Sequence, residues 1–356
     1  MNRFIIVSYV LSFFFILSLS FGFLFPIEAQ AQSDGSNLSI PGQVPDIQEQ
    51  ISVDVSPTIP KPGEEVTITI EAYGTDLNRA NIVWQYNGAT KLKGTGEKVF
   101  KFNVGKVGSR NAVNLTINPV NGPAITKTFS FTPAEIDLLW EASTYTPPFY
   151  KGKALFTPQS SVKLVALPNM IAGGSPVPAS KTVYKWKIDQ EVQGDKSGYG
   201  KNTFQYDSSV ILRPHSITAE GYSSADPSVS GASKVTFDAT DPEALIYEDH
   251  PLYGLLFNQA LSNQFELTDQ EKKLAAYPYF FSTLSKNNGL SYKWTINDNI
   301  ITAPATQNTM RFQKTSQDSG TGDVRVVINN SDKFLQQASQ RIFIFFNGSA
   351  ASFGVQ

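Results

Sequence analysis

The sequence contains no cysteine, and this absence excludes several kinds of chemistry at once. Without a thiol the chain has no disulfide, no Cys-ligated zinc, no thiol nucleophile and no lipid-modified cysteine behind a signal peptide. Any folded domain must therefore be held by hydrophobic packing alone. With 41% hydrophobic and 12% aromatic residues, the chain has enough apolar side chains to fill several small cores.

Histidine and excess charge are scarce as well. The two histidines, His215 and His250, each stand next to a proline and belong to no nucleophile or metalloprotease motif. The 29 basic and 31 acidic residues nearly cancel, and the basic ones are scattered singly, so we expect no nucleic-acid partner. We also expect no enzymatic activity, no cofactor and no metal.

The sequence has one long apolar run, at residues 4–25, and no second run of that length. Arg3 precedes the run, Pro26 ends it, and Ala29-Gln30-Ala31 is the small-x-small pattern that a signal peptidase recognises. Residues 1–31 are therefore predicted to be a signal peptide. An uncleaved N-terminal anchor is the alternative, because a run of this length can span a bilayer. Either way, we expect an exported bacterial protein in an extracellular, cell-surface or periplasmic location.

After this segment the pattern changes to short strands. Residues 32–48 are polar and rich in Ser, Gly and Pro, which predicts a flexible linker. Beyond them, short runs of alternating polar and apolar residues are separated by Gly, Pro and Asn. In residues 65–71, for example, the alternation places Val66, Ile68 and Ile70 on one face of a strand. This pattern predicts an all-β protein.

One segment favours a helix instead. Residues 268–276 (TDQEKKLAA) combine helix-forming residues with Thr268 as a possible N-cap and Glu271 three positions later. We expect a short helix there.

Tryptophan recurs at domain-length intervals. Trp84, Trp186 and Trp294 are 102 and 108 residues apart, and each begins a W-x-(Tyr/Ile)-(Asn/Asp) segment. Such a strand places Trp and the following Tyr or Ile on one face, and the Asn or Asp then opens a turn. This period is typical of whole sandwich domains, so the tryptophans are predicted core residues. The predicted antiparallel β-sandwich domains 1, 2 and 3 are residues 49–133, 134–239 and 240–347, with a tail at residues 348–356.

The repeat resembles PKD-type and related bacterial immunoglobulin-like domains. The resemblance rests on one Trp in a mid-domain strand, a Gly-rich turn and a late alternating strand such as residues 108–117 (GSRNAVNLTI). The chain departs from the PKD pattern after the Trp, because it has Tyr86-Asn87-Gly88 and its counterparts where those domains have a Gly-Asp-Gly-like turn. The resemblance implies tandem Ig-like sandwiches that act as extracellular spacers or interaction modules. It supplies no ligand residues.

Two aromatic stretches stand in proline-bearing, non-strand positions at residues 145–150 (YTPPFY) and 277–281 (YPYFF). Loops at sandwich ends commonly carry binding function, and exposed aromatic rings suit carbohydrate or protein contact. The same residues could equally pack a junction between domains. The candidate ligand or junction contacts are Tyr145, Phe149, Tyr150, Tyr277, Tyr279 and Phe280.

An acidic group marks the predicted junction between domains 2 and 3. It is either a solvated linker or a calcium site, because Ca²⁺ takes several hard oxygen ligands. The spacing matches no known calcium loop. Its members are Asp238, Asp241, Glu243, Glu248 and Asp249.

These observations predict a non-enzymatic cell-envelope or secreted protein whose stacked sandwiches act as spacer, adhesion or interaction modules. We expect an elongated monomer, with a protein or glycan partner at the cell surface and membrane contact only through an uncleaved N-terminal segment. Two alternatives remain. One is a carbohydrate-binding accessory protein that uses the aromatic loops. The other is a component of a pilus or secretion assembly whose strand edges pair with a partner chain.

Overall fold

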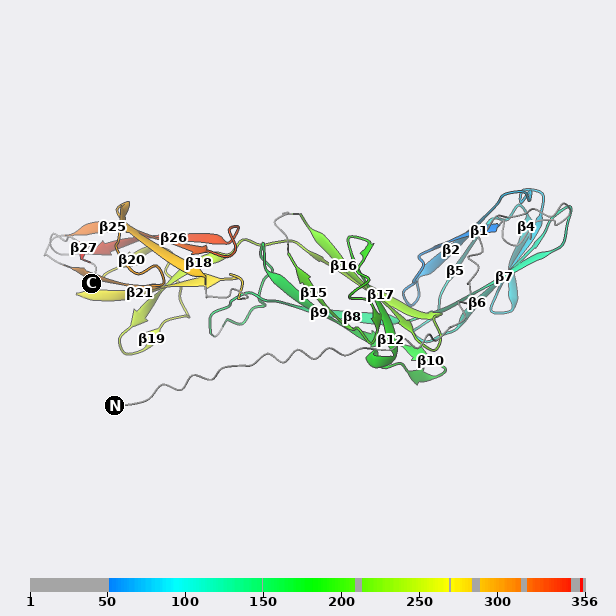
Figure 1. Ribbon diagram of the computed structural model, residues 1–356, viewed down its shortest axis with the longest axis horizontal. Helices are drawn as coiled ribbons and strands as arrows, with labels where there is room; N and C mark the ends of the chain where they lie inside the picture. The colour runs from blue at the N-terminus through cyan, green and yellow to red at the C-terminus, as the bar shows by residue number, and fades with distance from the viewer. Residues whose placement is uncertain are drawn as a thin grey trace, which may run out of the picture. The chain divides into compact units, whose positions relative to one another are not determined.

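The computed structural model describes residues 51–148, 150–208, 213–268, 270–283, 289–314, 319–346 and 353–354. These residues form β-strands almost throughout (Figure 1), and one turn of 3-10 helix lies among them at Ala179–Lys181. None of the helical segments in these ranges has the length and apolar character needed to cross a bilayer. The predicted signal segment, residues 1–31, and the predicted linker, residues 32–48, lie outside the described residues.

The first sandwich consists of two antiparallel sheets. One has the order β1-β2-β5, and the other contains β4-β3-β6-β7. This order, with β1, β2 and β5 in one sheet facing β4, β3, β6 and β7 in the other, is that of an immunoglobulin-like sandwich. Its strands are β1 (Ile51–Ser56), β2 (Glu65–Ala72), β3 (Asn81–Tyr86), β4 (Ala89–Thr95), β5 (Val99–Asn103), β6 (Asn111–Asn118) and β7 (Ile125–Pro133).

Alternating side chains explain why these segments pair as sheets. In β2, Val66, Ile68 and Ile70 are fully buried, and the residues between them face away from the core. From the opposite sheet, Ile82 and Leu115 enter the same hydrophobic cluster. Each strand therefore buries one face against the other sheet, as its sequence pattern predicts.

The second sandwich repeats this order. β8, β9 and β15 form one sheet, and β13, β12, β16 and β17 follow one another in the other. Its strands are β8 (Glu135–Ala142), β9 (Ser161–Asn169), β10 (Ile171–Ala172), β11 (Ser175–Pro176), β12 (Thr182–Ile188), β13 (Glu191–Val192), β14 (Gly198–Tyr199), β15 (Thr203–Asp207), β16 (His215–Ser223) and β17 (Val229–Phe237).

The third sandwich repeats it again, with β18, β21 and β24 in one sheet and β23, β22, β25 and β26 in the other. Two short strands extend these sheets, because β27 pairs with β24 and β20 pairs in parallel with β26. Its strands are β18 (Glu243–His250), β19 (Gly254–Leu255), β20 (Asn263–Glu266), β21 (Glu271–Tyr279), β22 (Leu290–Ile296), β23 (Asn299–Ile300), β24 (Thr309–Lys314), β25 (Gly320–Asn330), β26 (Gln337–Phe346) and β27 (Phe353–Gly354).

A tryptophan fills the centre of each sandwich. Trp84, Trp186 and Trp294 are 0%, 0% and 1% exposed, and each belongs to a different hydrophobic cluster. Each indole N–H donates to a main-chain carbonyl in the connection that leads to the next core strand. The acceptors are Glu97 O at 2.9 Å, Lys201 O at 2.9 Å and Gln307 O at 3.2 Å.

Each tryptophan also meets a phenylalanine from the opposite sheet. Trp84 stacks on Phe100 with ring centroids 5.2 Å apart, and Trp186 stacks on Phe204 at 5.1 Å. Trp294 meets Phe312 edge-on at 6.5 Å. The sequence pattern had not marked these phenylalanines, although they recur 16 to 18 residues after each Trp. A Trp–Phe pair between sheets is thus part of the repeated unit.

The Asn or Asp of the repeated motif forms the turn that follows the Trp strand. Asn87, Asp189 and Asn297 have φ of 50°, 48° and 48°, in the left-handed region that Asn and Asp tolerate better than other side chains. Each side-chain oxygen also accepts a main-chain N–H at the start of the neighbouring strand. The donors are Ala112 at 2.8 Å, Ser216 at 2.8 Å and Asp323 at 2.9 Å.

The helix predicted at residues 268–276 is wrong, because the described part of this segment enters β21. Glu271 begins the strand, and Leu274 and Ala276 lie in the hydrophobic cluster of the third sandwich. β21 pairs with β18 on one side and β24 on the other. Tertiary pairing and burial therefore override the local helix propensity of the Glu-Lys-Lys-Leu-Ala-Ala sequence.

Main-chain pairing continues from the first sandwich into the second. β7 and β17 pair in parallel through Thr132↔Val229 and Pro133↔Ser230, so the two large sheets join into one. The N–H of Thr132 donates to Ser228 O at 2.8 Å, and the N–H of Ala134 donates to Ser230 O at 2.9 Å. The division into independently folding domains stays a prediction. The strands of the first two sandwiches lie within the predicted ranges, whereas β27 of the third lies in the predicted tail, residues 348–356, and pairs with β24.

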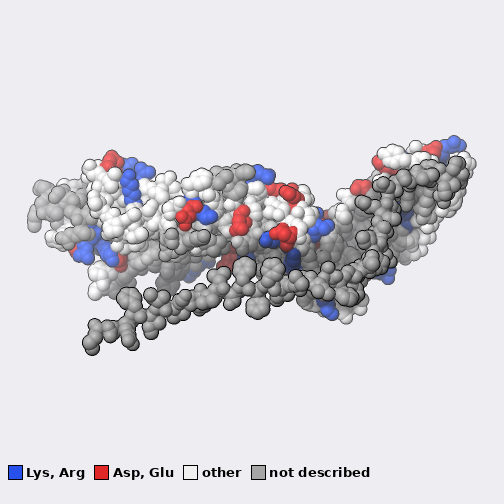
Figure 2. Space-filling view, in the orientation of Figure 1, with Lys and Arg blue, Asp and Glu red and all other residues white. Residues whose placement is uncertain are grey.

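The surface carries mixed charge. Figure 2 shows basic and acidic side chains interspersed on the visible face, with wide uncharged areas between them. This agrees with the formal net charge of −2. No extended field of one sign is visible among the described residues of that face.

Candidate ligand-binding site

The two aromatic stretches predicted from the sequence meet in the structure. The loop that follows β8 pairs with the segment that follows β21, in an antiparallel bridge between Thr144 and Ser282. The N–H of Tyr145 donates to Phe281 O at 2.7 Å, and the N–H of Phe280 donates to Tyr145 O at 2.8 Å. Main-chain bonds between the second and third sandwiches therefore position the aromatic side chains.

Part of this aromatic set fills the junction. Tyr279 and Phe280 are buried in a small cluster with Tyr247, whose hydroxyl lies 2.5 Å from that of Tyr279. The ring of Tyr150 packs edge-on against both Tyr279 and Phe280, with centroids 5.8 Å apart in each case. These three candidates pack against one another, and Tyr150 remains 37% exposed. Phe149 lies outside the described residues.

The other two candidates, Tyr145 and Tyr277, line a pocket of about 440 Å³. This volume lies within the range of small-molecule sites. Tyr292 of β22, which the sequence analysis did not single out, completes the set of tyrosines. We call this the tyrosine pocket; its lining is Tyr145, Tyr277, Pro278, Phe281, Ser282, Thr283, Leu290, Tyr292, Thr306 and Asn308.

The three phenols of the tyrosine pocket influence one another. Burial raises the pKa of Tyr292 to about 12, and the neighbouring Tyr145 and Tyr277 add to the shift. Burial also raises the pKa of Tyr145, again with a contribution from Tyr277. Burial raises the pKa of Tyr277, and the nearby Asp249 carboxylate raises it further. All three hydroxyls are therefore neutral hydrogen-bonding groups at physiological pH.

Ser282 gives the pocket an unusual polar group. The residue is 7% exposed, and its Oγ is buried without a hydrogen-bond partner among the described residues. Its N–H is satisfied by Gln336 Oε1 at 2.9 Å. A buried hydroxyl that lacks a partner is destabilising by roughly 1–3 kcal/mol. No pattern in the sequence marks this residue, because a serine after two phenylalanines has no distinctive context until the chain is folded.

The pocket is suited to binding rather than to bond breaking. Its lining residues, all within the described chain, include no Asp, Glu, His, Lys or Arg. A nucleophile would therefore find no general base among these described lining residues. The available chemistry is stacking on aromatic rings and neutral hydrogen bonding.

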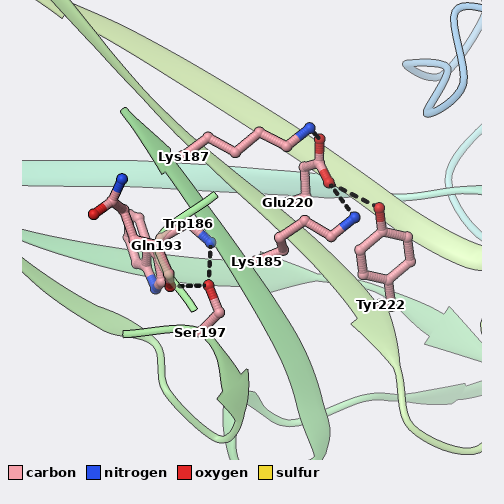
Figure 3. Close-up of polar contacts among 7 residues, drawn as sticks. All are labelled: Lys185, Trp186, Lys187, Gln193, Ser197, Glu220 and Tyr222. Carbon is pink, nitrogen blue, oxygen red and sulfur yellow. Dashed lines mark hydrogen bonds and ion pairs between the residues drawn. The ribbon is translucent and has the colours of Figure 1, made fainter. Parts of the chain in front are cut away.

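A charged cluster lies elsewhere, on β12 and β16 of the second sandwich (Figure 3). Glu220, 8% exposed, accepts hydrogen bonds from Lys187 and, at 2.9 Å, from the Tyr222 hydroxyl. Lys185 Nζ lies 3.3 Å from Oε2 of the same carboxylate. Burial alone would raise the pKa of Glu220, but these hydrogen bonds and charges outweigh it and hold the pKa below its usual value. Both carboxylate oxygens are occupied, so the cluster serves structure.

Neither histidine is placed for catalysis. His215 Nδ1 lies 2.7 Å from Asp189 Oδ2, and its Nε2 is buried without a partner, and so without a nucleophile, among the residues that the structure describes. His250 Nδ1 accepts the N–H groups of Leu252 and Tyr253 at 3.1 and 3.3 Å, which closes a turn.

Two members of the acidic group at the second junction are paired with lysines. Glu248 and Asp249 each lie 2.6 Å from a lysine ammonium, those of Lys272 and Lys273. Among the residues that the structure describes, no set of three or more His, Cys, Asp or Glu side chains converges as a metal site would require. The calcium interpretation therefore has no geometric support in this part of the chain.

No model of a known protein family matches the chain, and no curated protein matches it. Solved structures that resemble it include fibronectin(III)-like modules of Clostridium thermocellum CbhA (12% identity, 53% of this chain, 94% of that one, TM-score 0.24). Three N-terminal domains of the bacteriophage RB49 outer capsid protein Hoc are 10% identical, with 84% of this chain and 98% of that one covered and a TM-score of 0.25. The Bacteroides ovatus protein SGBP-B, solved with a mixed-linkage heptasaccharide, is 8% identical, with 83% of this chain and 70% of that one covered and a TM-score of 0.22. Identities and TM-scores this low assign no family, so the immunoglobulin-like fold rests on the strand order within each sandwich.

Proposed function

We propose that this chain is a non-enzymatic, exported protein whose tandem immunoglobulin-like sandwiches serve as a spacer that carries an interaction site. The observation that supports this most is the repetition of one sandwich order three times, with each centre filled by a Trp–Phe pair. A filled core leaves no room for a buried reaction centre. We include in this proposal that the sandwiches are of the PKD type and that the protein acts in adhesion.

The contacts between sandwiches also support a spacer. The parallel pairing of β7 with β17 and the main-chain bonds of Tyr145 both cross from one sandwich to the next. The tyrosine pocket, with its neutral lining, supports an interaction role better than a catalytic one. Export rests on the sequence of residues 1–31.

Fractionation of a bacterium that expresses the chain from its own start codon tests the proposal. We expect the protein outside the cytoplasm, with an N-terminus at Gln32 if the segment is cleaved or with an intact N-terminus in the membrane fraction if it is an anchor. Recovery in the cytoplasm would contradict export. Small-angle scattering by the purified chain tests the spacer, and the dimensions of a compact globule would contradict it.

A further inference from the structure

The tyrosine pocket is the part of the molecule that a purely mechanical spacer does not need. It lies where the loop after β8 meets the third sandwich, and main-chain bonds from both sides hold its walls. We infer that this pocket binds a neutral carbohydrate. The inference rests on the interaction role proposed above and names the ligand class of that site.

The apolar part of the lining fits a sugar ring. Tyr145, Tyr277 and Tyr292 contribute aromatic rings from three separate segments of the chain, and Phe281 and Leu290 add apolar surface. A sugar presents a face of C–H groups that packs on an aromatic ring, while the tyrosine hydroxyl remains available for a hydrogen bond. Such sites combine an apolar wall with a few placed polar groups, as this pocket does.

The polar part of the lining fits sugar hydroxyls. Ser282, Thr283 and Thr306 supply hydroxyl groups, and Asn308 supplies an amide. Thr283 Oγ1 already donates to Ser143 O at 3.2 Å and Asn308 Nδ2 to Ala276 O at 3.4 Å, so these two residues offer a ligand mainly their oxygen atoms as acceptors. The Oγ of Ser282 has no partner within the described part of the chain, and a ligand hydroxyl beside it could supply one. Groups of this kind both donate and accept, which matches the hydroxyls of a sugar.

Other ligand classes match the pocket less well. A peptide strand needs free main-chain groups, but those of Tyr145 are already bonded to Phe281 and Phe280, and the N–H of Tyr292 donates to Ala305 O at 2.7 Å. An anion would find no basic side chain among the lining residues that the structure describes. A quaternary ammonium ligand could use the aromatic rings but not the hydroxyl and amide groups.

The test is a binding screen of the purified full-length chain against neutral gluco-, galacto-, manno- and xylo-oligosaccharides, followed by calorimetric titration of those that bind. Betaine and choline are included in the same screen. Three variants examine the pocket: Ser282→Ala, Tyr292→Phe and Tyr145→Ala. Tyr199→Ala is the matched control, because Tyr199 is exposed on β14 of the second sandwich.

We expect the unchanged chain to bind at least one oligosaccharide. Ser282→Ala and Tyr292→Phe each remove one hydroxyl and should weaken binding roughly threefold to tenfold. Tyr145→Ala removes a ring and should weaken binding about tenfold or more. Ser282→Ala should also leave thermal stability unchanged or raise it, because it removes a buried hydroxyl that has no partner. Tyr199→Ala should bind as the unchanged chain does.

Two results would overturn the inference. One is the absence of binding to every oligosaccharide in the screen, or binding to betaine or choline alone. The other is carbohydrate binding that all three pocket variants leave unchanged, which would place the site elsewhere. Neither result bears on export or on the scattering dimensions, so the spacer proposal would stand or fall separately.

Discussion

Asn87 and Ala112 bond to each other twice. The N–H of Asn87 donates to Ala112 O at 2.8 Å, and the N–H of Ala112 donates to Asn87 Oδ1 at the same distance. Asp189 with Ser216 and Asn297 with Asp323 repeat this pair of bonds in the other two sandwiches. The polar residue of the W-x-(Tyr/Ile)-(Asn/Asp) motif thus connects the Trp strand to its neighbour.

We expect Asn87→Ala to lower the free energy of unfolding by about 1–3 kcal/mol, because alanine loses the side-chain bond and tolerates the left-handed backbone poorly. Urea unfolding followed by tryptophan fluorescence measures the change. Asn87→Gly should recover part of the loss, since glycine accepts the positive φ. Asn118→Ala, at the exposed end of β6, is the control. Equal stability of Asn87→Ala and Asn118→Ala would show that the repeated bonds contribute little.

Gln336 connects the second and third sandwiches through a buried side-chain amide. Its Nε2 donates to Pro158 O at 2.8 Å, and its Oε1 accepts from Ser282 N and Asn330 Nδ2, both at 2.9 Å. The residue is 1% exposed. Gln336→Ala would leave these groups buried without partners, so we expect a loss of about 2–4 kcal/mol in unfolding free energy. Hydrogen exchange should localise the effect to the segments around Pro158 and Ser282.

The control for this prediction is Gln337→Ala, one residue further along. Gln337 is exposed at the start of β26 and has the same side chain. Its replacement should change stability by less than about 0.5 kcal/mol. A similar effect from both variants would mean that the buried amide does not hold the two sandwiches together.

Much of the fold follows from local pattern. Alternation predicts strands such as β2 and β6, and the spacing of Trp84, Trp186 and Trp294 predicts repeated sandwiches, because both signals record burial of one strand face. The failure at residues 268–276 has a physical cause: helix propensity is local, whereas the pairing of β21 with β18 and β24 is not. The sequence did contain a counter-signal, since residues 274–278 echo residues 164–168, which lie in β9.

The candidate site was only half predictable. Proline and aromatic residues marked Tyr145 and Tyr277, but the sequence could not separate them from Tyr279 and Phe280, which fill the junction. Tyr277 and Tyr279 lie two residues apart in β21, so they share a face, and Tyr277 packs on the junction cluster as well as lining the pocket. The pocket itself forms only where the loop after β8 joins the end of β21. Ser282 is recognisable as a candidate only in the structure, where its buried Oγ has no hydrogen-bond partner among the described residues.

Alkaline pH should destabilise the third sandwich. Burial raises the pKa of Tyr292 from 10.0 to about 12. An unfolded chain releases this proton near pH 10, and the folded chain retains it until about pH 12. Within that window the unfolded state binds fewer protons, so stability falls as pH rises. Urea midpoints measured from about pH 9 to about pH 12 should fall less steeply for Tyr292→Phe than for the unchanged chain, and Tyr199→Phe should follow the unchanged chain. Identical slopes for all three would contradict the assignment.

Gly231 allows the first and second sandwiches to share a sheet. A Cβ at this position of β17 would lie 2.6 Å from Ala134 O and 2.8 Å from Ala134 C, which are main-chain atoms of the link between β7 and β8. Gly231→Ala should therefore push this link away from β17 and cost about 1–3 kcal/mol of stability. Hydrogen exchange at the N–H groups of Thr132 and Ala134, whose acceptors Ser228 O and Ser230 O flank Val229, reports the displacement. Gly194→Ala is the matched control, because a Cβ there would meet nothing within 4 Å. The same hydrogen exchange and the same stability in Gly231→Ala and Gly194→Ala would contradict this prediction. The close approach of β17 to Ala134 would then not be needed to join the two sheets.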